Sequence, residues 1–324
     1  MPGYRTAIIV SIFILSSCAG EVTTPDSGVV DSGAVDAGFD GGVCVQMDAG
    51  TPISTVGDTT FKKGPFLTFT DGTSITMMWE SAAESDSVVE YGETSALGSR
   101  ATGEKATVHT IRLTGLKPGT QYFYRAGDGA TMTSILTAQT AARPGTPFRF
   151  AAYGDSQSNP ERHELVVSGI EKFGPALVLH AGDIVNDGYN EKEWQELVFD
   201  VTRALAHRVP YFVGIGNHEN QSPLFFSYLS YPAPAGADSP AGYYSFRWGD
   251  VFFVVFNSRT FFLGTLDTQY KWAKKQLGSA EARRAKWRIA LWHEVAYTEA
   301  WGHCDYVGEE RFRDTLIPML EESG

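Results

Sequence analysis

Continuous hydrophobic runs alternate with amphipathic stretches in the second half of the chain. The continuous runs lie at 148–153, 176–180, 211–215, 251–256 and 287–292. Because they are short and apolar throughout, they predict strands that are buried on both faces. Apolar residues spaced three and four apart predict helices that begin at Asn159-Pro160, at Asn190 and at Asp267, with a last helix over 312–320. We therefore expect an α/β layered domain over residues 147–324.

The pattern differs over residues 59–143, where short alternating or aromatic runs are separated by turn residues. The runs lie at 66–69, 74–79, 88–91, 107–113, 121–126 and 133–137. This pattern predicts a small all-β sandwich. Within 110–125, the order Leu116, Pro118, Thr120, Tyr122, Tyr124 resembles a corner of fibronectin type III-like domains. We find no catalytic constellation here and expect a packing or spacer domain.

The N-terminus predicts an export signal. The apolar run 6–15 follows Arg5 and is too short for a bilayer span, which needs about 20 residues. Leu15-Ser16-Ser17-Cys18 resembles a bacterial lipobox, which implies a signal peptide over 1–17 and lipidation of Cys18. The alternative is an ordinary signal peptide with an incidental cysteine. We expect an exported protein that is lipid-anchored at the cell envelope, at the outer membrane or cell surface.

The composition of residues 18–58 predicts a flexible acidic linker. This segment is rich in Gly, Asp, Ser and Ala, which bury too little apolar area to offset the entropy of ordering. A calcium-binding Asp/Gly repeat is the alternative. A disulfide between Cys44 and Cys304 is allowed in an exported protein. The whole chain carries a formal net charge of −12, which argues against nucleic-acid binding.

Residues that carry chemistry follow four of the predicted buried strands. They are Gly154-Asp155, Gly182-Asp183, Gly216-Asn217-His218-Glu219 and His293. Any one of them alone could be a turn or packing residue. Open α/β sheets bind ligands outside the carboxyl ends of their strands, so the set predicts one shared crevice. Mixed Asp, Asn and His ligands suit Mn, Fe and Zn, and a carboxylate can bridge two ions.

These ordered motifs are similar to those of the calcineurin-like metallophosphoesterase superfamily. Together with the preceding β domain, they resemble the purple acid phosphatase branch. The resemblance implies that Asp155 binds one metal ion, that Asp183 bridges two, and that Asn217 and His293 bind the second. It also implies that His218 faces the substrate phosphate. His303 resembles the histidine over the leaving group, with an ordinary loop histidine as the alternative.

Two departures from the branch affect these expectations. The tyrosine that colours purple acid phosphatases, three residues after the bridging aspartate, is replaced by Asn186, which either ligates a metal or only forms hydrogen bonds. We therefore expect no purple charge-transfer band. The final Gly-His-x-His motif, which would supply one more ligand to each metal, does not occur in the sequence, so we expect a partial catalytic domain.

The expected function is a metal-dependent phosphatase that hydrolyses phosphate monoesters with a metal-activated hydroxide. Its expected cofactors are two divalent or trivalent transition-metal ions, namely Fe, Mn or Zn. Its expected partner is a small phosphoester substrate, and the oligomeric state is open. A phosphodiesterase or nucleotidase that uses the same site is one alternative. A truncated, inactive surface lipoprotein is the other.

Overall fold

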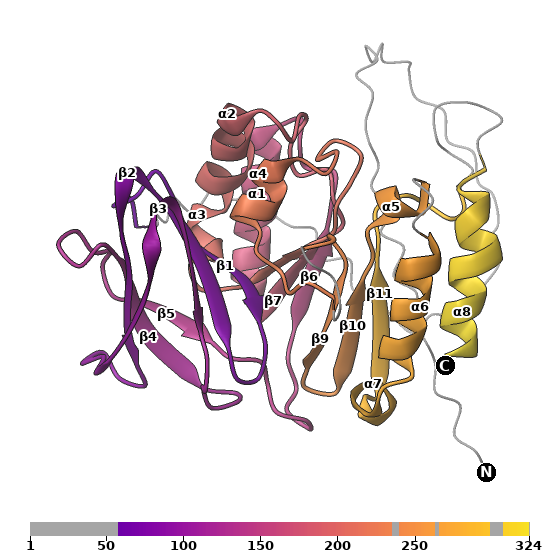
Figure 1. Cartoon of the computed structure of the whole chain (residues 1–324), viewed down its shortest axis with the longest axis horizontal. Coiled ribbons are helices and arrows are strands. Elements are labelled where there is room, and N and C mark those ends of the chain that lie inside the picture. The colour runs from indigo at the N-terminus through magenta and orange to yellow at the C-terminus, as the bar shows by residue number, and fades with distance from the viewer. Residues whose placement is uncertain (1–57, 235–239, 263–265, 299–306, 324) are drawn as a thin grey trace, which may run out of the picture.

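The computed structural model describes residues 58–234, 240–262, 266–298 and 307–323 (Figure 1). The expectations for the signal peptide, Cys18, Cys44, His303 and Cys304 lie outside these residues, as does the linker up to residue 57. Among the helices within these ranges, none combines the length and the apolar composition that a bilayer crossing requires.

The N-terminal region is all-β, as predicted. Its strands are β1 (Lys63–Thr70), β2 (Ile75–Gly92), β3 (Ser99–Leu113), β4 (Gln121–Gly127) and β5 (Leu136–Gln139). The prediction of separate strands at 74–79 and 88–91 is wrong, because both belong to β2. The ladder between β2 and β3 has irregularities between Glu80 and Ser87, where side chains are mostly exposed, so the strand continues through a polar bend.

The second region begins with a parallel sheet. Strands β6 (Phe150–Tyr153), β7 (Leu177–His180) and β8 (Tyr211–Val213) pair in that order. They alternate with α1 (Pro160–Phe173), α2 (Glu191–Glu193), the π-helix η1 (Trp194–Phe199), α3 (Asp200–Ala206) and, after β8, α4 (Pro223–Tyr228). The side chain of Asn159 caps α1 and that of Asn190 caps α2, which confirms both predicted helix starts.

A second sheet of three strands follows. Its strands, in spatial order, are β11 (Trp287–Leu291), β10 (Val251–Val255) and β9 (Tyr244–Trp248). Its helices are α5 (Ser258–Phe262), α6 (Leu266–Leu277), α7 (Ala280–Arg284), the π-helix η2 (Phe312–Leu316) and α8 (Ile317–Glu322). Strand β9 and the short helices α4, α5 and α7 were not predicted. Strand β9 has an alternating burial pattern in which Tyr244, Phe246 and Trp248 are buried, a signal that was present in the sequence.

Strand β10 contributes to two hydrophobic cores. Phe253 and Val255 belong to the core that includes β6, β7 and β8, whereas Phe252 and Val254 pack in a second core with α6 and α8. Helices α6 and α8 lie on the side of the second sheet that faces away from β6 and β7 (Figure 1). The layered α/β class is therefore confirmed. Residues that follow parallel strands of both sheets, Asp155, Asp183 and His293, come close to one another.

An aromatic seam joins the two domains. We use this name for Phe66 and Phe69 of β1 and the rings that they meet. The Phe66 ring centroid lies 5.5 Å from that of Phe199 and 5.3 Å from that of Tyr211. Phe69 contacts Phe212 in the same way at 6.1 Å. Because these rings share one hydrophobic core, the β domain is packed on the α/β domain over this face.

Candidate metal centre

Tight turns after β6 and β7 present two aspartates. Asp155 has a φ of 49° and Asp183 a φ of 54°, values that non-glycine residues adopt infrequently. Gly182 has a φ of 106°, and a Cβ atom there would lie 3.0 Å from Nδ1 of His293. Glycine is therefore required for close approach of this turn to the loop after β11. Backbone strain of this kind commonly occurs at functional sites.

Glu219 connects the turn after β7 to the turn after β8. Its fully buried carboxylate accepts hydrogen bonds from the backbone N–H groups of Gly216 at 2.7 Å, Asp183 at 2.9 Å and Ile184 at 2.8 Å. A Cβ atom at Gly216 would overlap the Asp183 carboxylate. Glu219 was assigned no role from the sequence. Its place in Gly-Asn-His-Glu was the one signal in the sequence, and that signal does not reveal which backbone groups the carboxylate binds.

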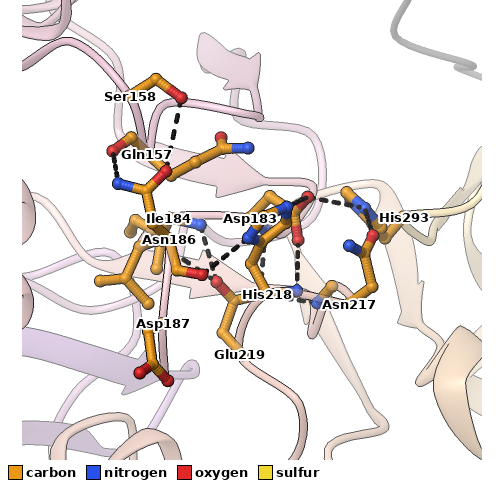
Figure 2. Close-up of polar contacts among 12 residues, drawn as sticks. Gln157, Ser158, Asp183, Ile184, Asn186, Asp187, Asn217, His218, Glu219 and His293 are labelled. Carbon is orange, nitrogen blue, oxygen red and sulfur yellow. Dashed lines mark hydrogen bonds and ion pairs between the residues drawn. The ribbon is translucent and has the colours of Figure 1, made fainter. Parts of the chain in front are cut away.

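Three predicted ligands converge. The candidate ligand atoms of Asp155, Asp183 and His293 all lie within 4.8 Å of one another. Nε2 of His293 lies 3.2 Å from Oδ2 of Asp183 and 3.0 Å from Oδ1 of Asn217, so a fourth predicted residue joins the cluster (Figure 2). Nδ1 of His293 lies 3.2 Å from the carbonyl oxygen of Ala181. This contact fixes the ring so that Nε2 faces the cluster.

The electrostatics of the cluster favour a positive charge at its centre. Burial opposes the charged form of His293, but the hydrogen bond and charge of Asp183 outweigh it and raise the pKa of the ring to about 9. Burial also opposes ionisation of Asp183, yet the hydrogen bond from His293 keeps the pKa of Asp183 below its usual value. Burial raises the pKa of Asp155 despite the nearby His293. A bound cation would take the place of the proton on His293.

His218 lies beside this cluster and is partly accessible. Its backbone N–H donates to Oδ1 of Asp183 at 3.0 Å, and its Nδ1 donates to the carbonyl oxygen of Asn186 at 2.7 Å. Nε2 then lies on the other side of the ring, 3.8 Å from Oδ2 of Asp183. The side chain is 39% exposed, which leaves Nε2 available to a ligand in the crevice.

The side chain of Asn186 is directed elsewhere. Its Nδ2 donates to the carbonyl oxygen of Gln157 at 2.8 Å, and its Oδ1 accepts from the Ser158 hydroxyl at 3.5 Å (Figure 2). In this structure Asn186 acts through hydrogen bonds, of which the contact from its backbone carbonyl to His218 is the most direct link to the centre.

The residues present fit a transition-metal centre. Two carboxylates, an amide oxygen and an imidazole nitrogen converge, which is a donor set suited to Mn, Fe or Zn. The Ala181 carbonyl behind His293 and the His218 N–H on Asp183 are outer contacts of the kind that orient metal ligands. The set offers no phenolate, because position 186 is Asn.

Comparison with known proteins identifies the family of the chain. The calcineurin-like phosphoesterase family model matches residues 148–321, and the model of the purple acid phosphatase N-terminal domain matches residues 63–140. The chain therefore belongs to the calcineurin-like phosphoesterase family, within which its N-terminal domain marks it as purple acid phosphatase-like. The family predicted from the motifs is confirmed.

Individual relatives are distant. The chain is 28% identical over 258 residues to acid phosphatase type 7 of Danio rerio, which covers 69% of this chain and 56% of the relative. It is 26% identical over 255 residues to purple acid phosphatase 15 of Arabidopsis thaliana, which covers 67% and 46%. The chain thus spans about half the length of these relatives. The structure of the yellow lupin purple acid phosphatase PPD1 shares the fold, with a TM-score of 0.65 at 18% identity over 80% of this chain and 56% of that one.

Proposed function

We propose that this protein is a metal-dependent phosphatase that acts on phosphate monoesters. The observation that carries the proposal is the convergence of Asp155, Asp183 and His293, with Asn217, from the ends of strands in two different sheets. Membership in the phosphoesterase family supports the reaction class. The names of the relatives, acid phosphatases and purple acid phosphatases, support the substrate class.

The four converging residues would hold the metal ions. When bound, such ions supply Lewis acidity and a hydroxide nucleophile at neutral pH. The chain contributes the rest of the site. Asp183 lies within reach of both Asp155 and His293, and its two carboxylate oxygens could serve two ligand positions. The pKa of His293 means that the ring must lose its Nε2 proton before it can ligate a metal.

His218 would meet the substrate. Because Nδ1 donates to Asn186, the ring presents Nε2 to the crevice, where the protonated form donates a hydrogen bond to a phosphoryl oxygen. Such a donor stabilises charge that grows on the equatorial oxygens as the ester bond breaks. With Asn186 in place of a tyrosine ligand, the loaded protein is expected to be colourless, with Mn, Zn or Fe(II) as the fitting ions.

Metal removal and substrate comparison test the proposal. The full chain is stripped with a chelator, reloaded separately with Mn, Fe or Zn, and assayed on p-nitrophenyl phosphate and bis-p-nitrophenyl phosphate. We expect hydrolysis to disappear on stripping, to return with at least one ion, and to be faster on the monoester. Faster diester hydrolysis would indicate a phosphodiesterase. Bound metal without turnover of either ester would contradict the proposal and indicate an inactive protein.

A further inference from the structure

An ionic cluster that is buried on one side lies at the junction of the two domains, and we call it the junction cluster. It consists of Lys62, Lys63, Glu80, Glu191 and Tyr228. The side chains of Lys63 and Glu80 are buried, whereas those of Lys62 and Glu191 are half exposed and lie 3.1 Å apart at Nζ and Oε1. Nζ of the fully buried Lys63 lies 2.6 Å from Oε2 of Glu80 and 3.0 Å from Oε1 of Glu191. The Tyr228 hydroxyl donates to Oε2 of Glu80 at 3.1 Å, and its ring lies 5.0 Å from the Lys63 ammonium. Lys63 and Glu80 come from the β domain, and Glu191 begins α2 of the other domain.

Stability alone is a weak reason for such a cluster. Removing two charges from water costs several kcal/mol per ion, and apolar replacements of buried ion pairs are often as stable. The aromatic seam already packs β1 on the α/β domain. What the cluster adds is a directional link that fixes the position of α2.

Helix α2 carries Glu193, which holds the loop after β7. Oε2 of Glu193 accepts the backbone N–H groups of Asn186 and Asp187, each at 2.8 Å. Its Oε1 accepts Nδ2–H of Asn190 at 3.1 Å. One carboxylate therefore orients the peptide groups of Asn186 and Asp187.

The same loop holds His218. The Asn186 carbonyl oxygen accepts from Nδ1 of His218 at 2.7 Å, and the Gly188 N–H donates to the His218 carbonyl oxygen at 2.9 Å. In the singly protonated ring the first contact places that proton on Nδ1, so Nε2 is the atom turned toward Asp183. Nε2 is then the nitrogen that takes up the second proton, which the protonated form donates to the substrate.

We propose that Glu193 is a positioning residue for His218, and that the junction cluster couples this position to the β domain. The N-terminal domain is then part of the device that aims the substrate-facing ring, in addition to packing against the second domain. The activity part of the test rests on the proposed phosphatase function. The tautomer part is independent of it, so the two can fail separately.

The first experiment compares Glu193→Ala with Glu196→Ala in the full chain. Glu196 lies three residues further on and, among the residues that the structure describes, forms its ion pair with Lys192 on the surface, which makes it a matched control. Long-range ¹H–¹⁵N spectra of the histidine rings, in buffer with diamagnetic Zn²⁺, report which nitrogen of His218 carries the proton. A His218→Gln spectrum assigns the signal. We expect Glu193→Ala to mix the tautomers and Glu196→Ala to leave them unchanged.

Measurements of phosphatase activity in the same variants add a second test of the role of Glu193. A ring that is misplaced by a fraction of an ångström lowers kcat for p-nitrophenyl phosphate by roughly tenfold while metal content stays the same. Glu193→Gln keeps an acceptor oxygen for both N–H groups, so it is expected to restore both tautomer and kcat. A protein with a merely structural Glu193 would show a lower melting temperature in Glu193→Ala with unchanged His218 signals, and this would overturn the proposal.

The second experiment tests the link to the β domain. Lys63→Met together with Glu80→Gln removes both buried charges at once, which avoids leaving one unpaired. Lys62→Met is added to the same variant, because Nζ of Lys62 also pairs with Oε1 of Glu191 at 3.1 Å and would otherwise keep the link. The control is Lys105→Met with Asp86→Asn, an exposed pair of the same domain with its charged atoms 3.5 Å apart. We expect the junction variant to shift the His218 signals in the same direction as Glu193→Ala, and the control not to. Wild-type His218 signals in a folded junction variant would overturn the coupling.

Discussion

Two histidine clusters flank strands β6 and β7, and they differ in charge: the pKa shifts favour neutral rings in one and a protonated His293 in the other. In the interior cluster, the Tyr153 hydroxyl donates to Nε2 of His163 at 2.8 Å, and Nδ1 of that ring donates to the Leu197 carbonyl oxygen at 3.1 Å. Burial lowers the pKa of His163 to about 4 and lowers that of His180 as well. In the metal centre, Asp183 raises the pKa of His293 to about 9 despite similar burial.

The difference shows what distinguishes a structural from a functional buried histidine. Burial lowers the pKa of His163 more than its hydrogen bond to the neutral Leu197 carbonyl raises it, so the ring stays uncharged at neutral pH. A paired carboxylate reverses this balance at His293 and creates a place that holds a proton in the absence of metal and would hold a cation instead. The identity of the partner therefore determines the charge of each ring, and burial alone does not.

The largest expected effect comes from removing the negative charge of Asp183, the partner of His293. Asp183→Asn keeps the shape of the side chain but removes the negative charge, so His293 should behave like His163 and its pKa should fall. We expect loss of bound metal and a decrease of about a thousandfold in phosphatase rate. Metal analysis and p-nitrophenyl phosphate kinetics measure both. Asp187→Asn, an exposed acid of the same loop, is the control, and equal losses in both variants would refute a specific role of Asp183.

The second largest expected effect is a loss of folding stability at acid pH, which arises from the interior cluster. The pKa of His163 is lowered to about 4 from its ordinary 6.5, so the unfolded chain binds the proton more tightly. Stability is full above pH 6.5 and decreases as pH falls toward 4, by up to about 3 kcal/mol from this ring. Urea unfolding in EDTA at stepwise pH measures the slope. His163→Gln should flatten it, and an unchanged slope in that variant would count against this assignment.

The smallest of these effects concerns the residue that holds Asp183 in place. Glu219→Gln replaces one acceptor oxygen with an NH₂ group that faces backbone N–H donors, so the turns after β7 and β8 should move apart slightly. We expect metal affinity to fall by about 10- to 100-fold with the fold intact. Competition with a colorimetric zinc chelator measures the affinity. The exposed Glu161→Gln serves as the control, and wild-type affinity in Glu219→Gln would be inconsistent with the proposed role.

Sequence reasoning reached the strand-end residues because their position follows from a general rule. Asp155, Asp183, Asn217 and His293 each follow a continuous apolar run, and parallel strands open to one edge. The residues that it missed act through partners distant in sequence. Glu219 bonds to backbone groups more than thirty residues away, and Lys63 would be expected on the surface by its charge, yet it is buried.

Two errors in the predicted strands came from relying on the local pattern of polar and apolar residues. The polar segment within β2 has the composition of a turn, but β2 continues through it as one strand, with regular pairing to β3 on either side of an irregular stretch. Strand β9 was missed although Tyr244, Phe246 and Trp248 alternate, because aromatic residues in a short run with Arg247 and Ser245 gave no continuous apolar signal. In both cases the tertiary environment decided between readings that the sequence left open.

The aromatic seam has a practical consequence for anyone who edits this protein. Deleting residues 58–143 would expose the rings of Phe199, Tyr211 and Phe212 to water, so the remaining α/β domain is expected to aggregate. A chimera with the N-terminal domain of a relative would need aromatic residues at the positions of Phe66 and Phe69, because these rings complete the core of the α/β domain.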